Sequence, residues 1–180
     1  MRKEILLTGF GGQGLILAGI LMAESAVLFQ GLNAIQNQVY GIEARGGECR
    51  SEVILSDATI HHADVDEPDV VLCMSQMAFN KFAPLVKDGG LVVVDTVFVE
   101  DTAKLKPGSR LKSYPITEIC SKATGKTIMA NVTALGILAQ LTGLISPENM
   151  EKEVLSRVPA GTEDINRKAL YAGVEAAKAG

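Results

Sequence analysis

The chain has 180 residues, of which 47% are hydrophobic and 21% are charged, and its formal net charge is −4. This length suits one domain, and this composition excludes disorder as the main state. With 4% aromatic residues and no basic surplus, the chain lacks the features of a nucleic-acid-binding surface. We therefore expect a single domain over residues 1–180 and no nucleic-acid partner.

The beginning of the chain and its three cysteines indicate a cytoplasmic protein. Residues 1–4 lead directly into an apolar run and a glycine-rich segment, which is not the pattern of a signal peptide. The longest apolar stretch, residues 15–23, is too short to cross a bilayer, so no membrane partner is expected. Cys49, Cys73 and Cys120 lie far apart, and no two have metal-site spacing, so we expect reduced thiols and no metal.

Short apolar runs alternate with helical patterns along the chain. Strands are predicted over residues 4–8, 33–39, 51–56, 70–74 and 91–95, the third of them half-exposed. Helices are predicted over residues 12–29, 77–86 (ending early at Pro84), 127–144, from 146 onward, and 162–179. This order predicts an α/β fold: an open, mostly parallel, Rossmann-like sheet with helices on both faces and a helical C-terminal third.

A glycine-rich segment joins the first predicted strand to the first helix: Gly9-Phe10-Gly11-Gly12-Gln13-Gly14. It matches the dinucleotide pattern G-x-G-x-x-G, in which glycines allow a tight turn and a helix N-terminus faces an anion. The acid expected about 20 residues later is missing, since residues 33–38 contain no carboxylate and no arginine. Three interpretations stay open: nicotinamide binding, close packing of the helix on the sheet, or contact with a ligand or a partner subunit.

A second unusual segment follows the second predicted strand: Tyr40-Gly41-Ile42-Glu43-Ala44-Arg45-Gly46-Gly47. It lies near the carboxyl edge of the predicted sheet, where open α/β folds bind their ligands. Adjacent glycines beside two opposite charges indicate a shaped loop. Either Glu43 and Arg45 form an ion pair that holds the loop, or the loop is presented to a ligand or partner.

Polar residues also follow two buried strands and should lie at the same edge. Ser75-Gln76 and Asp95-Thr96 together would line a crevice with the glycine loop; singly, each is typical of a helix cap or turn. Asn131 is expected to be a buried residue bonded to a neighbouring loop.

Two further positions invite a chemical interpretation. The pair His61-His62 is expected to be solvent-exposed rather than metal-binding. Cys49, close in sequence to Arg45 and Arg50, would have a lowered thiol pKa if those cations lie beside it.

The chain resembles the gamma subunit, or gamma domain, of 2-oxoacid:ferredoxin oxidoreductases over essentially its whole length. The resemblance rests on the two glycine-rich segments above, the second running on to Ser51-Glu52-Val53, together with Pro68-Asp69-Val70, Ser75-Gln76, Asn131-Val132-Thr133-Ala134-Leu135-Gly136 and Asn166-Arg167-Lys168-Ala169-Leu170-Tyr171-Ala172-Gly173. It departs from many relatives at Ile42, where they have Pro, and at Ala44, where they have Arg. These two departures leave open the subfamily to which the chain belongs and do not affect the resemblance to the family.

The resemblance implies a subunit of an enzyme that converts a 2-oxoacid and coenzyme A to an acyl-CoA, carbon dioxide and reduced ferredoxin. It implies thiamine diphosphate and iron–sulfur clusters in alpha, beta and possibly ferredoxin-like delta partner subunits, and no cofactor or catalytic residue in this chain. Pyruvate, 2-oxoglutarate, branched-chain oxoacids and indolepyruvate all stay open as substrates, and the short chain favours 2-oxoglutarate by analogy. A stand-alone nicotinamide-dependent oxidoreductase and an anion-binding module are the alternatives.

The positions expected to face a ligand or a partner subunit are Gly9, Gly11, Gly12, Gln13, Gly14, Tyr40, Glu43, Arg45, Gly46, Gly47, Ser75 and Gln76.

Overall fold

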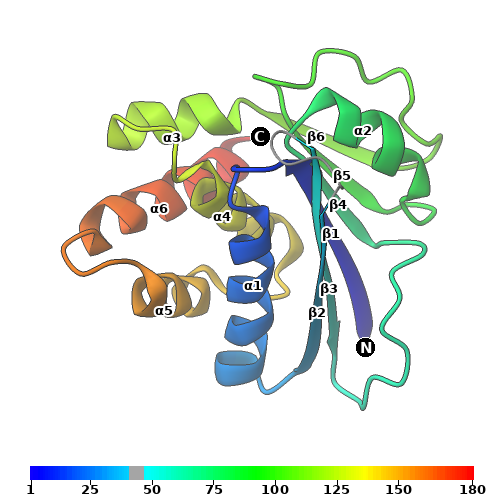
Figure 1. Ribbon diagram of the computed structural model, residues 1–180, viewed down its shortest axis with the longest axis horizontal. Helices are drawn as coiled ribbons and strands as arrows, with labels where there is room; N and C mark the ends of the chain where they lie inside the picture. Colours follow the sequence, from blue (N-terminus) through cyan, green and yellow to red (C-terminus); the bar gives the residue numbers. More distant parts are fainter. Residues whose placement is uncertain (41–46) are drawn as a thin grey trace.

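A six-stranded sheet forms the centre of the computed structural model, which describes residues 1–40 and 47–180 (Figure 1). The strands are β1 (Arg2–Phe10), β2 (Asn33–Tyr40), β3 (Glu48–Ser56), β4 (Val70–Cys73), β5 (Leu91–Asp95) and β6 (Arg110–Tyr114). Their order is β2-β3-β1-β4-β5-β6. Only β3 runs against the others, because it pairs antiparallel with both β1 and β2 while the remaining pairs are parallel. The predicted open, mostly parallel sheet is confirmed.

Helices cover both faces of this sheet. They are α1 (Leu15–Gln30), α2 (Gln76–Phe82) with the 3-10 turn η1 (Ala83–Leu85), α3 (Ile116–Thr124), α4 (Ala130–Thr142), α5 (Pro147–Arg157) and α6 (Glu163–Ala179). Figure 1 shows α2 on one side and the other helices on the opposite side. The chain after β6 is entirely helical, as predicted, but β6 and α3 were not among the predicted elements.

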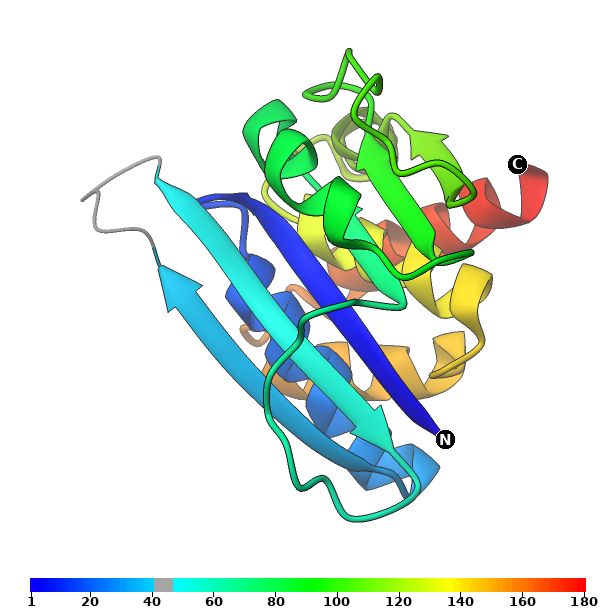
Figure 2. The same cartoon turned by 90° about the vertical axis from the view of Figure 1, so that its right-hand side faces the viewer.

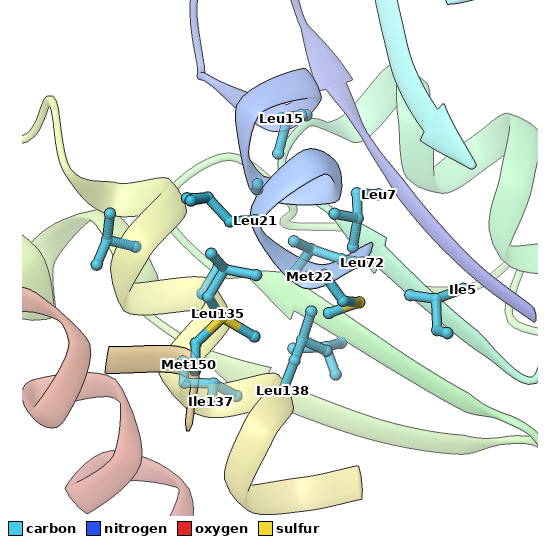
Figure 3. Packing of buried hydrophobic residues seen from close by; sticks show 14 of the residues in the cluster. Ile5, Leu7, Leu15, Leu21, Met22, Leu72, Leu135, Ile137, Leu138 and Met150 are labelled. Carbon is cyan, nitrogen blue, oxygen red and sulfur yellow. The ribbon is translucent and has the colours of Figure 1, made fainter. Parts of the chain in front are cut away.

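Alternating side chains of the central strands fill two apolar layers. On β1, Ile5 and Leu7 point into the larger layer with α1 and α4, whereas Leu6 points toward α2. Figure 3 shows the larger layer, where side chains of β1, β4, α1, α4 and α5 meet. On the other side, Phe79 and Phe82 of α2 are buried against the sheet. This double coverage explains why β4 is apolar throughout and why β1 and β5 contain continuous apolar runs.

The strand predicted over 51–56 is buried on both faces, so the half-exposed interpretation is wrong. Ile54, which alternation turns away from α1, is 0% exposed. The loop of residues 57–69 crosses that face of the sheet (Figure 2), and Asn37 Nδ2 donates to Ala63 O there at 3.0 Å. A long loop therefore covers the part of this face, over β2 and β3, that α2 does not reach.

Local signals place several helix ends as predicted. Pro84 lies in η1, where α2 has already ended. Ser146 caps α5, because its Oγ accepts a hydrogen bond from the backbone N of Asn149 at 3.2 Å. Both ends come from residues whose own chemistry stops or starts a helix.

Helices α4 and α6 cross backbone to backbone at two glycines. A Cβ added to Gly136 would lie 2.0 Å from Leu170 O, and one added to Gly173 would lie 2.0 Å from Thr133 O. No side chain fits in either place without moving a helix. The crossing fixes the helical layer that supports α1 and its preceding loop.

Candidate functional site

The glycine loop lies where the chain direction changes in the sheet. From β1 the chain passes through α1 to β2 on one side, and from β4 it passes through α2 to β5 on the other. Open α/β sheets bind ligands at such a switch point, beyond the carboxyl ends of the strands. Gly11 N donates to Gly47 O at 3.0 Å, so the end of the second predicted segment lies beside the first.

The side chain of Gln13 closes the gap between the ends of β1 and β4. Its Oε1 accepts a hydrogen bond from Phe10 N at 2.9 Å, and its Nε2 donates to Met74 O at 2.8 Å. A Cβ added to Gly9 would lie 2.1 Å from that Oε1. Gly9 therefore leaves room for the glutamine side chain, which a larger residue at this position would displace.

The rest of the glycine loop shapes the start of α1. Gly12 and Gly14 have φ values of +99° and +72°, and α1 begins at Leu15 rather than at residue 12 as predicted. Asn131 is 5% exposed and donates from Nδ2 to Gly14 O at 3.1 Å, so its predicted bond to a neighbouring loop is confirmed. This bond ties α4 to the glycine loop.

Ser75 and Gln76 lie at the same edge, and their side chains hold neighbouring backbone. Ser75 Oγ accepts from Ala78 N at 3.2 Å and caps α2. Gln76 Oε1 accepts from Glu100 N at 2.9 Å and Asp101 N at 3.0 Å, while its Nε2 donates to Asp101 O at 2.7 Å. These two residues therefore fix α2 and the loop after β5 in place.

Asp95 has the capping role that was one of its two interpretations. Its Oδ1 accepts from Val97 N at 3.1 Å. Its Oδ2 accepts from the backbone N of Thr117 at 3.1 Å and from the hydroxyl at 2.6 Å, in the first turn of α3. The carboxylate is buried and already bonded within the chain.

Part of the second predicted segment cannot be placed. Glu43, Arg45 and Gly46, with the ion pair proposed between the first two, lie outside the described residues. The backbone of Tyr40 pairs with Cys49 at the end of β2, and Gly47 is buried.

Large apolar side chains at the ends of β1 and β5 and at the start of α2 are wholly or partly exposed at this edge, and the sequence reasoning missed them. The rings of Phe10 and Phe98 meet edge to face, with centroids 5.6 Å apart. Val97 and Phe98 are 42% and 38% exposed, and Met77 in the first turn of α2 is 64% exposed. We call Phe10, Met77, Val97 and Phe98 the apolar edge. Large apolar residues directly after a strand, where polar turn residues are usual, were the available signal.

The cysteines do not form a reactive site. Burial raises the pKa of Cys49, so the expectation of a lowered thiol pKa is wrong. Burial also raises the pKa of Cys73 to about 12. Within residues 1–40 and 47–180, no three His, Cys, Asp or Glu side chains are grouped to hold a metal ion, and His61 and His62 are exposed as predicted. In the same part of the chain, no helix combines the length and apolar character that a bilayer span requires.

The second half of a dinucleotide site is missing for a structural reason. Strand β3 lies between β1 and β2, so the end of β2 is displaced from the glycine loop by two strand spacings, about 10 Å. The polar run of β2 also has no carboxylate for a ribose. Fold and site therefore define a wound α/β domain with a Rossmann-type turn, at which the side chain of Gln13 bridges the ends of β1 and β4.

Comparison with known proteins identifies the family. The family model described as pyruvate ferredoxin/flavodoxin oxidoreductase matches residues 4–176, and the chain belongs to this family. The 2-oxoglutarate synthase subunit KorC of Methanocaldococcus jannaschii is 44% identical over 99% of this chain and 95% of its own length. The crystal structure of the keto/oxoacid ferredoxin oxidoreductase gamma subunit from Geobacter sulfurreducens has a TM-score of 0.89 at 42% identity, covering 99% of this chain and 98% of that one.

Other relatives contain the same domain within a longer chain. The ketoisovalerate oxidoreductase subunit VorA of Methanothermobacter thermautotrophicus is 33% identical over 97% of this chain, which matches 36% of that protein. A 2-oxoglutarate:ferredoxin oxidoreductase from Magnetococcus marinus, solved with 2-oxoglutarate, coenzyme A and succinyl-CoA bound, shares the fold with a TM-score of 0.87 at 22% identity, covering 99% of this chain and 31% of that one. The resemblance drawn from the sequence is confirmed: this chain is a gamma-type subunit of a 2-oxoacid:ferredoxin oxidoreductase, and the nicotinamide alternative has no support.

Proposed function

We propose that the chain serves a 2-oxoglutarate:ferredoxin oxidoreductase, which forms succinyl-CoA, carbon dioxide and reduced ferredoxin from 2-oxoglutarate, coenzyme A and oxidised ferredoxin. The observation that supports this substrate is the end-to-end match at 44% identity to a 2-oxoglutarate synthase subunit. The ketoisovalerate relative is less similar, at 33%. Coenzyme A as co-substrate is supported by the ligands of the Magnetococcus enzyme, which shares the fold.

The catalytic cofactors belong, in this proposal, to alpha and beta subunits and possibly a ferredoxin-like delta subunit. There, thiamine diphosphate would supply the chemistry of decarboxylation and iron–sulfur clusters the electron transfer to ferredoxin. The described residues of this chain instead bond to one another: Gln13, Gln76 and Asp95 all hold its own backbone. The chain's contribution is then a rigid surface, acting as one domain over residues 1–180 in the cytoplasm.

We place the contact with the sister subunits at the carboxyl edge of the sheet. Gly11 and Gly12 are exposed there, and Gly47 is bonded to the first of them. The apolar edge flanks these loops, and permanent subunit interfaces contain such apolar contacts at their centre. Tyr40 at the end of β2, and Glu43, Arg45 and Gly46 after it, enter this proposal together with Gly11, Gly12 and Gly14. The other positions predicted to face a partner are buried or bonded within the chain and support these loops from behind: Gly9, Gln13, Gly47, Ser75 and Gln76.

The test is purification of the tagged chain from its native cells. We expect it to bring down larger subunits with thiamine diphosphate, and we expect the eluate to reduce ferredoxin with 2-oxoglutarate and coenzyme A. Activity with pyruvate, branched-chain oxoacids or indolepyruvate in place of 2-oxoglutarate would contradict the substrate. Recovery of the chain alone would contradict the subunit role.

A pair of matched variants tests the location of the interface. Phe98→Asp introduces a charge into the apolar edge and should abolish co-purification of the sister subunits. Leu28→Asp places the same charge on an apolar residue that is 64% exposed at the far end of α1, and it should leave assembly intact. If Leu28→Asp abolished co-purification and Phe98→Asp did not, the interface would lie on the α1 side instead.

A further inference from the structure

Two carboxylates meet between α1 and α5, which pack side by side (Figure 1). Glu24 comes from α1 and Glu153 from α5, and their side chains are 33% and 3% exposed. One guanidinium serves both: Arg157 Nε lies 3.5 Å from Glu153 Oε1, and Arg157 also bonds to Glu24 Oε1. Ser156 Oγ donates to Glu153 O at 2.8 Å and lies 3.4 Å from Glu153 Oε1.

The second oxygen of Glu24 lacks a donor. Within the described part of the chain, Glu24 Oε2 is buried and has no hydrogen-bond partner. The carboxylates line a groove of about 400 Å³ whose other walls include Val27, Leu28 and Ala34. Two negative charges with one positive partner in apolar surroundings are unfavourable, and so is a buried oxygen with no donor.

We propose that Glu153 keeps a proton in the folded chain and donates it to Glu24, and that the contact between α1 and α5 is a pH-dependent latch that loosens when this proton leaves. A proton on Glu153 would donate to the orphaned Oε2 of Glu24 and remove one of the two negative charges. The remaining carboxylate would then be matched by Arg157 alone. This latch does not depend on the proposed substrate or subunit interface.

The charged surroundings agree with a proton on Glu153. Burial raises the pKa of Glu153, the neighbouring Glu24 raises it further, and Arg157 lowers it by less. Helix α4 contributes no ionisable residue, and the wall from β2 is apolar. On α6, Arg167 and Tyr171 bond to Glu151 instead. Arg157 is therefore the only cation that the described contacts give to the pair.

The sign of the pH effect follows from the raised pKa. A carboxyl whose pKa is higher in the folded state binds its proton more tightly there, so it adds stability at low pH. That stability is fully present below the pKa of the unfolded chain and is lost as the pH rises through the folded value. Alkaline pH should therefore release α5 from α1.

The test compares Glu153→Gln with wild type, using thermal unfolding of the full chain at pH 5 and pH 8. The glutamine amide resembles the protonated carboxyl and stays neutral at both pH values, whereas Glu153 loses its proton as the pH rises. The Tm of the variant minus that of wild type should therefore be about 2–4 °C larger at pH 8 than at pH 5. Glu100→Gln, at an exposed carboxylate, is the control and should give a difference that does not change with pH. A constant difference for Glu153→Gln would overturn the proposal.

A measurement on the unmodified chain keeps the test independent of whether the variants fold. Infrared difference spectra between pH 5 and pH 8 should show the loss of a protonated-carboxyl C=O band. This band should lie at a higher wavenumber than that of solvent-exposed protonated glutamates. Amide exchange in residues 147–157, corrected for intrinsic rates, should accelerate over the same interval while that of α6 stays constant. Absence of the band, or equal exchange at both pH values, would overturn the latch.

Discussion

Replacing Gln13 by alanine tests whether this side chain holds the sheet together or waits for a ligand. The substitution removes the acceptor for Phe10 N and the donor to Met74 O, a residue that is 0% exposed. Each buried polar group left without a partner costs about 1–3 kcal/mol, and water can reach this half-buried site in part. We therefore expect the free energy of unfolding to fall by about 2–3 kcal/mol, which corresponds to a Tm lower by about 4–10 °C.

The assay is thermal and urea unfolding of the isolated chain, followed by circular dichroism. Gln30→Ala, at an exposed glutamine at the end of α1, is the matched control and should change stability by less than about 0.5 kcal/mol. If Gln13→Ala kept the wild-type Tm while the assembled enzyme lost activity, the bonds to Phe10 and Met74 would be incidental. The glutamine would then belong to a ligand or partner contact.

Three further outcomes are expected. Gly136→Ala should lower the free energy of unfolding, measured by calorimetry, by about 3 kcal/mol, because the added Cβ would clash with the backbone of α6 at Leu170. A variant as stable as wild type would contradict the described helix crossing. Hydrogen bonds from Arg167 and Tyr171 lower the pKa of Glu151 in the folded chain. Glu151→Gln should therefore lower the Tm at pH 7 by about 2 °C, and this decrease should disappear as the pH falls through the folded pKa of Glu151. A decrease in Tm that persists at low pH would show that the charge of Glu151 is not its cause. Arg45→Ala should reduce recovery of the sister subunits in pull-down experiments without changing the Tm of the isolated chain, whereas a large drop in Tm would favour the ion pair with Glu43.

The parts of the fold that were predictable have strong local signals. The runs that became β4 and β5 are apolar throughout, and only a strand covered on both faces needs such a run. The glycine turn and the Ser146 cap depend on backbone chemistry within a few residues. Neither required knowledge of the rest of the chain.

The missed elements depend on tertiary structure. Strand β6 reads Arg-Leu-Lys-Ser-Tyr and is largely exposed at its start because it lies at the sheet edge, so an apolar criterion does not find it. One face of β3 is covered by α1, and the other by the loop of residues 57–69, which follows β3 in the chain and crosses the sheet there. Periodicity within a strand cannot reveal such a cover.

The site shows the same division between local and tertiary information. The sequence located the loops at one sheet edge, and the bond from Gly11 to Gly47 agrees with that placement. The sequence could not show which polar side chains form hydrogen bonds within the chain, because Gln13 and Gln76 bond to residues more than twenty positions away. For Cys49, nearby cations in the sequence suggested a lowered pKa, but burial decides the direction.

Reconstitution of the enzyme from separate subunits tests the central claim most directly. The account predicts that this chain alone neither binds NAD or NADP nor reduces ferredoxin, and that adding it to the sister subunits restores 2-oxoglutarate- and coenzyme-A-dependent ferredoxin reduction. Oxidation or reduction of any 2-oxoacid by the chain alone, or full activity of the sister subunits without it, would contradict the account.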